Sequence, residues 1–243
     1  MVLRILFAVC IIAEIIFTPL FLKAQWPGMC FKSLVYKMIC STGFVGVGVL
    51  SMFIADNTST YAVMMVAGLV LGWIGDYFLH AKSTNTYFAI GFISFFLGHI
   101  MYIRCFIRTL PVIVPDYKMF DIPELAVTLA FVVVAVVSVF KFKIEFSTNF
   151  LKVAVGGYTL ILITMFVKAT ALGIGYLLSG GEHGIWAVIL LSLGAFGFML
   201  SDASLGLILF GGQKGKKPLK VFNMVTYFAG QTMLASSILF IRG

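Results

Sequence analysis

The sequence predicts an all-α protein, a polytopic membrane bundle of about eight transmembrane helices. Of its 243 residues, 61% are hydrophobic and only 11% are charged, whereas soluble domains have about 25% charged and 45–50% apolar residues. Long apolar runs recur through the whole chain, and a spanning helix needs about 20 such residues. Because no stretch is left for a separate soluble domain, we expect one integral membrane domain over residues 1–243.

Eight apolar runs are long enough to cross a bilayer. They cover residues 2–22, 34–54, 61–80, 87–110, 121–140, 150–172, 185–210 and 219–241. Charged or helix-breaking residues separate them, as at Asp56-Asn57-Thr58-Ser59 and Pro115-Asp116-Tyr117-Lys118. The first run has a single basic residue at its start, Arg4, and precedes no small-residue cleavage site. We therefore expect it to be a retained span and not a signal peptide.

The basic residues predict how the chain lies in the membrane. Eleven belong to the connections after the first, third, fifth and seventh spans: Lys23, Lys32, Lys37, Lys82, Lys141, Lys143, Lys152, Lys214, Lys216, Lys217 and Lys220. Five belong to the opposite face: Arg4, Arg104, Arg108, Lys118 and Arg242. Lys168, within the sixth span, counts for neither face. Because cytoplasmic loops are enriched in Lys and Arg, we expect both termini to be non-cytoplasmic, in a bacterial inner membrane or a eukaryotic endomembrane.

The net charge of +8 does not point to nucleic acid, since these lysines fit an anionic membrane surface better. A metal site also has little support. Asp76 and His80 share a helix face, but the chain has only three histidines and no cysteine cluster with metal-ligand spacing. We expect neither a metal nor a cofactor.

Two aspartates lie deep in apolar runs, in similar surroundings. Asp76 follows Gly75 and Asp202 follows Ser201, and each stands three residues before a leucine. A carboxylate in hydrocarbon is costly and by default marks a functional site. A buried structural pair is the alternative, and the repeated setting favours function.

The similarity extends to the following span in each half. Phe96-x-Gly98-His99-x-Met101 and Phe228-x-Gly230-Gln231-x-Met233 share one pattern. This predicts two parallel four-helix repeats, residues 1–110 and 121–243, with a site at their interface.

Other polar residues have a functional and a structural interpretation. His99 and Gln231 are candidate partners of the acids or simple interhelical hydrogen-bond donors. Tyr102 and Tyr227 share faces with them or anchor span ends. Lys37 contacts a lipid phosphate or snorkels to the head groups. Glu14 and Tyr158, which lie mid-span, line a cavity at the site or are buried groups whose hydrogen bonds are satisfied within the protein.

Taken in order, the motifs resemble the YhhN-type lysoplasmalogenase family. They are Gly75-Asp76-x-x-Leu79, Gly98-His99-x-x-Tyr102, Ala154-Val155-x-x-Tyr158, Ser201-Asp202 and Tyr227-x-x-Gly230-Gln231, with Lys37 matching the family's second-helix lysine. The chain departs from the family in lacking a proline soon after Lys37 and in having Gly230, not alanine, before Gln231.

The resemblance implies hydrolysis of the vinyl ether of a lysoplasmalogen, a lysophospholipid, to a fatty aldehyde and a glycerophospho-ethanolamine or -choline. Protonation of the outer alkene carbon leaves an oxocarbenium-like cation that water captures, as in glycoside hydrolysis. One aspartate would be the acid and the other would stabilise the cation. We favour Asp202 as the acid because Ser201 and Ser204 could hold it.

Two other classes of function stay open. A proton-coupled small-molecule or lipid transporter would also place paired acids between repeats and would have broken helices at its site. A non-catalytic lipid-binding protein would use the same basic rim.

Overall fold

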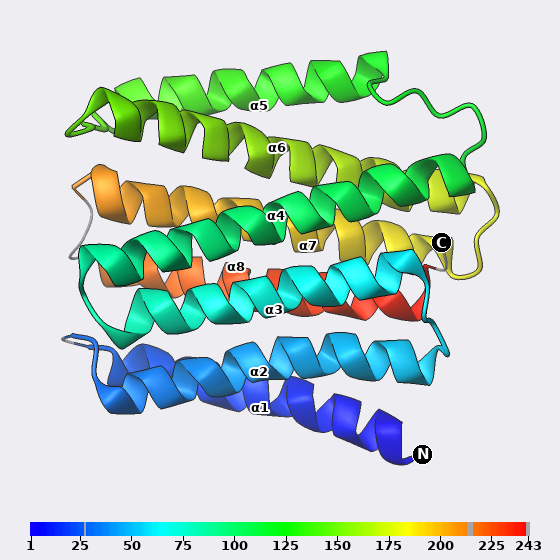
Figure 1. Cartoon of the computed structure of the whole chain (residues 1–243), viewed down its shortest axis with the longest axis horizontal. Helices are drawn as coiled ribbons and strands as arrows, with labels where there is room; N and C mark the ends of the chain where they lie inside the picture. The colour runs from blue at the N-terminus through cyan, green and yellow to red at the C-terminus, as the bar shows by residue number, and fades with distance from the viewer. Residues whose placement is uncertain (27, 213–215, 242–243) are drawn as a thin grey trace.

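The computed structural model describes residues 1–26, 28–212 and 216–241, which form α-helices and one short 3₁₀ helix and contain no strand. The helices are α1 (Val2–Ala24), α2 (Phe31–Ile54), α3 (Thr60–Ala81), α4 (Asn85–Ile113), α5 (Ile122–Lys141), α6 (Asn149–Leu178), α7 (Gly184–Phe210), α8 (Lys217–Ser236) and η1 (Ser237–Leu239). The predicted all-α fold is confirmed. Helices α1 to α7 are each long and apolar enough to span a membrane, so the chain is an integral membrane protein. The more polar α8 also runs through the bundle (Figure 1).

Three helices begin at a hydroxyl side-chain cap. Ser59, Thr84 and Thr148 precede α3, α4 and α6, and each hydroxyl accepts a hydrogen bond from the backbone N–H three residues later. Such a cap satisfies one of the N–H groups that the first helical turn leaves without a partner. These polar residues in the short connections therefore fix where the apolar runs become helical.

Two helix ends differ from the predicted spans by more than three residues. α6 continues to Leu178, beyond the predicted end at residue 172, because Gly173 lies against α7, where a Cβ would come 2.9 Å from the Cα of Val188. α8 ends at Ser236, before the predicted end at residue 241. The Asn57 side chain then holds the chain after η1 by donating to the carbonyl oxygens of residues 238 and 241.

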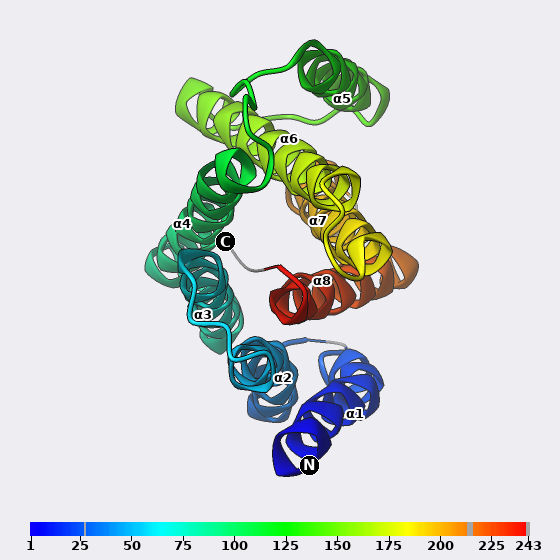
Figure 2. The same cartoon turned by 90° about the vertical axis from the view of Figure 1, so that its right-hand side faces the viewer.

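Six helices form a ring, and two lie outside it (Figure 2). Around the ring the contacts run α2–α3–α4–α6–α7–α8 and back to α2. α1 packs on α2 and α8, whereas α5 packs on α6. The order of neighbours in the first four helices recurs in the last four, as a parallel duplication would give, but the duplication itself stays a prediction.

Small residues bring neighbouring helices close together at corresponding places. A Cβ on Gly98 of α4 would lie 3.3 Å from the carbonyl oxygen of Gly68 on α3. A Cβ on Gly230 of α8 would lie 2.7 Å from that of Gly194 on α7. Helices in membranes associate through such close packing of small residues. The tight α3–α4 and α7–α8 pairs hold the two aspartate-bearing helices in place.

The odd-numbered helices all run in one direction and the even-numbered ones in the other (Figure 1). Asp76 lies five residues before the last residue of α3, and Asp202 lies eight before the last residue of α7. Both aspartates are therefore nearer to the same end of the bundle.

Candidate active site

The first cluster surrounds Asp76, which is 1% exposed. The Lys37 ammonium of α2 lies 2.9 Å from Oδ1 of Asp76. The hydroxyls of Ser41 and Tyr227 donate to Oδ2 at 2.5 and 2.8 Å. A cation and two hydroxyl donors thus occupy both carboxylate oxygens, which is the setting that favours an ionised carboxylate in an apolar interior.

Hydrogen bonds extend this cluster across the bundle to α4. Gln231 donates to the Tyr227 hydroxyl at 3.5 Å, and Tyr102 donates to Gln231 Oε1 at 2.8 Å. Gly72 makes room for the amide, because a Cβ there would lie 2.7 Å from Gln231 Nε2. Three residues singled out in the sequence, Tyr102, Tyr227 and Gln231, therefore belong to one network that ends on Asp76.

The second cluster surrounds Asp202, whose side chain is 9% exposed. Tyr158 of α6 donates to Asp202 Oδ2 at 2.5 Å. His99 Nε2 of α4 lies 3.1 Å from that oxygen and 3.1 Å from the Tyr158 hydroxyl. No lysine or arginine of the described residues pairs with Asp202. Its partners are a phenol and an imidazole.

Two polar atoms of the second cluster are left without protein partners. Asp202 Oδ1 has no hydrogen bond to any residue that the structure describes. His99 Nδ1 is buried and, within the same residues, also has none. Because buried polar groups are normally hydrogen-bonded, His99 Nδ1 is a candidate contact for a substrate or a water molecule. Asp202 is partly exposed, so its Oδ1 is a candidate contact as well.

Aromatic rings separate the two clusters, and no hydrogen bond or ion pair joins them in the described part of the chain. The Phe198 ring lies 4.6 Å from the His99 ring and 5.3 Å from the Tyr227 ring, between centroids. Phe95 contacts Phe198 and Tyr227 at 6.5 and 5.8 Å. We call Phe95 and Phe198 the aromatic layer.

The expected support of Asp202 by neighbouring serines is wrong. Ser201 accepts hydrogen bonds from the Asn223 side chain at its hydroxyl and carbonyl oxygens, at 3.0 and 2.6 Å. The Ser204 hydroxyl donates to the Leu200 carbonyl. The reason is helical geometry, because a residue one position away points about 100° around the helix.

Lys37 does not extend to the membrane surface. Its side chain is 6% exposed and paired with Asp76, so neither the snorkelling nor the phosphate-contact interpretation describes its position in the structure. Ser41, which the sequence analysis missed, lies four residues later on the same helix face. That spacing was the signal that could have revealed it.

A second buried ion pair was also missed. Lys168 of α6, 1% exposed, lies 2.5 Å from Glu124 of α5 and donates to the Tyr117 hydroxyl at 2.7 Å. Tyr117, in the connection before α5, also donates to Glu124. Burial, and then the hydrogen bond to this carboxylate, raise the pKa of Tyr117. This group fastens the otherwise peripheral α5 to the bundle.

Two other features lie apart from the clusters. His80 contacts the Ser33 hydroxyl at 2.7 Å, and no three His, Cys, Asp or Glu side chains of the described residues are grouped to hold a metal.

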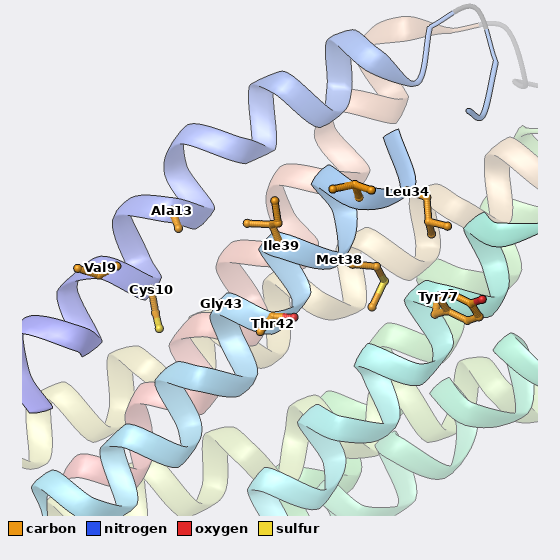
Figure 3. Close-up of a pocket in the computed structure, with 10 residues that line it drawn as sticks. Val9, Cys10, Ala13, Leu34, Met38, Ile39, Thr42, Gly43 and Tyr77 are labelled. Carbon is orange, nitrogen blue, oxygen red and sulfur yellow. The ribbon is translucent and has the colours of Figure 1, made fainter. Parts of the chain in front are cut away.

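An apolar groove of about 560 Å³ lies between α1 and α2, with Tyr77 of α3 at its edge (Figure 3). No residue of either cluster lines this groove.

Comparison with known protein families gives one match, which covers residues 41–238 and so includes both aspartates but not Lys37. No curated protein and no solved structure gave a significant match. The match spans most of the chain and contains the motifs on which the resemblance was based. The chain belongs to the YhhN family.

Proposed function

We propose that the protein is a membrane-embedded hydrolase that cleaves the vinyl ether bond of lysoplasmalogens. The observation that carries this proposal is the difference between the surroundings of Asp76 and those of Asp202. Asp76 has both oxygens occupied and a cation at 2.9 Å. Asp202 has uncharged or weakly basic partners on one oxygen and none on the other. One carboxylate is thus suited to stay charged and the other to carry a proton.

Asp202 is the proposed acid. Its Oδ1 has no hydrogen-bond partner in the described residues and can hold a proton toward the substrate, while Oδ2 accepts from Tyr158. Transfer of this proton to the outer alkene carbon turns the vinyl ether into an oxocarbenium ion. The Asp202 carboxylate that results is stabilised by Tyr158 and His99.

His99 is the proposed base for water. With an Nε2–H directed at the Asp202 carboxylate, the unpartnered Nδ1 has a lone pair that accepts a proton from water. The water oxygen bonds to the oxocarbenium carbon, and the proton returns through His99 to Asp202. The hemiacetal hydroxyl then loses its proton as the bond to the glycerol oxygen breaks, and that oxygen takes up one proton, so the products are a free aldehyde and the glycerol alcohol. A carboxylate that orients and stabilises an imidazolium has the same role in catalytic triads.

Asp76 is the proposed fixed counter-charge on the other side of the aromatic layer. The oxocarbenium carbon would lie where Phe198 now contacts both clusters, so that ring must move when substrate binds. Aromatic faces also stabilise cations within about 6 Å.

The unbroken helices favour this proposal over a transporter. Both α3 and α7 continue through their aspartates without a break, whereas transporter sites are typically formed by discontinuous helices.

The test is to incubate purified protein with lysoplasmenylethanolamine and measure the aldehyde. The saturated 1-O-alkyl analogue is the matched control, since it has no alkene carbon to protonate. We expect aldehyde from the vinyl ether alone, at a rate that a chelator leaves unchanged. Absence of aldehyde from folded protein, or transport of the intact lipid without cleavage, would refute the proposal.

A further inference from the structure

A cleft of about 520 Å³ opens between the end of α1 and the start of α8. It lies at the end of the bundle to which both aspartates are nearer (Figure 1). Its polar and aromatic lining comprises Lys23, Gln25, Trp26, Lys217 and Lys220, and no carboxylate of the described residues lines it. The cleft is therefore positively charged.

Two lysines of α8 lie close to the ring of Trp26. The Nζ atoms of Lys217 and Lys220 lie 4.5 and 5.2 Å from the centroid of its ring. Neither lysine makes an ion pair with a carboxylate of the described residues. Two ammonium groups over one ring repel each other unless an anion lies between them. Lysine is a common point-charge ligand for phosphate.

The cleft connects to the Asp76 cluster along one side of the bundle. Lys220 lies two turns before Tyr227 on α8, about 10 Å along the axis at 1.5 Å per residue. The ring of Phe21, next to the cleft, packs on Phe228 at 6.2 Å, and Phe228 packs on Tyr227 at 5.2 Å. Tyr227 donates to Asp76. Three packed aromatic rings, each at most 3% exposed, thus lie between the basic cleft and the buried carboxylate.

We propose that this cleft binds the phosphate of a phospholipid head group, with the rest of the lipid directed toward the Asp76 cluster. The lipid's identity as a lysoplasmalogen rests on the proposed function, whereas phosphate binding does not. Lys37 is already paired with Asp76, so the head group takes its cations from this rim.

The test uses Trp26 as its own reporter. The chain has three tryptophans, so the double variant Trp73→Phe/Trp186→Phe leaves fluorescence from Trp26 alone. Three probes are titrated into the full-length protein in detergent: non-cleavable 1-O-alkyl-lysophosphoethanolamine, the matching 1-O-alkylglycerol without phosphate, and inorganic phosphate. We expect the phospholipid probe to change the emission and to bind at least tenfold more tightly than either other probe.

Charge variants on this background then identify the lysines. The double variant Lys217→Gln/Lys220→Gln should weaken binding of the phospholipid probe at least tenfold. Its binding of 1-O-alkylglycerol should stay unchanged. Lys141→Gln/Lys143→Gln removes two basic residues of the α5–α6 connection and is the matched control. Equal weakening by both pairs would show a general surface charge and overturn the proposal.

The probes also separate the sources of phosphate. Binding of inorganic phosphate as tight as that of the phospholipid would make the cleft a free-phosphate site and overturn the head-group assignment. Because the probe cannot be cleaved, normal binding by a protein that yields no aldehyde would refute the proposed hydrolysis and leave this site standing.

Discussion

The Lys37–Asp76 ion pair predicts a strong energetic coupling that a double-mutant cycle measures. Lys37→Met leaves a buried carboxylate without its cation, and Asp76→Asn leaves a buried ammonium without its anion. The double variant leaves neither charge. It also keeps an acceptor for the Ser41 and Tyr227 hydroxyls, since the asparagine side chain has a carbonyl oxygen.

The distance sets the size of the effect. Two unit charges 2.9 Å apart attract by roughly 6 kcal/mol at an effective dielectric constant of about 20. Desolvation offsets much of that energy, but removal of one partner of a buried pair costs about 3–5 kcal/mol. We expect each single variant to lose about that much unfolding free energy and the double variant to lose less than their sum, with a coupling of at least about 3 kcal/mol.

The assay is reversible unfolding by SDS in mixed micelles, followed by circular dichroism. Asp76→Asn combined with Lys168→Met is the matched control, because Lys168 belongs to the separate pair with Glu124. These two changes should be additive within about 0.5 kcal/mol. Additivity for Lys37 and Asp76 as well would mean that the pair does not stabilise the fold, and the reasoning on the charge of Asp76 would be wrong.

Four further outcomes follow from the two clusters and the helix arrangement. Asp202→Asn should lower turnover per folded molecule by about 10²–10⁴ with little loss of stability, since it leaves no cation unpaired; near-normal aldehyde release would remove Asp202 from the mechanism. Tyr158→Phe should cost about tenfold in turnover, because one donor to Asp202 is lost while His99 remains; an unchanged rate would show that the bond has no part in catalysis. Lys168→Met should destabilise the protein by about 3–5 kcal/mol in thermal or SDS unfolding by leaving its carboxylate partner unpaired, and a wild-type transition would contradict this. Cysteines placed at Lys143 and Asp116 should be labelled from opposite sides of the membrane, with the former on the cytoplasmic side; labelling of Lys143→Cys from outside would reverse the predicted orientation.

The sequence was sufficient to predict the helices because their signal is local. A run of apolar residues has a length and a hydropathy that can be measured without its neighbours. The helix ends were less certain, because a glycine can stand either at the end of a helix or at a close contact between two helices. The sixth predicted span ended at residue 172, but the helix continues to Leu178 and Gly173 packs against Val188 within it.

The partners of the acids were predicted only in part, because they depend on which helices face each other. A repeated motif placed Asp76 and Gln231 among the candidates, and both now lie in one network. The motif could not indicate that Asp76 would take a cation from α2 while Asp202 would take a phenol from α6. It also could not indicate that Ser201 turns toward Asn223.

The division of roles proposed for the two aspartates comes from the facing helices and not from the aspartates themselves. Asp76 and Asp202 follow small residues in similar surroundings on α3 and α7, and each helix packs tightly on the next one through glycine. α2 presents Lys37 to the first acid, whereas α6 presents Tyr158 to the second. A cation favours the charged carboxylate, and a buried phenol leaves protonation open. The proposed hydrolysis of a vinyl ether uses one group of each kind, so under that proposal a single lysine on α2 would give two similar acids different chemical tasks.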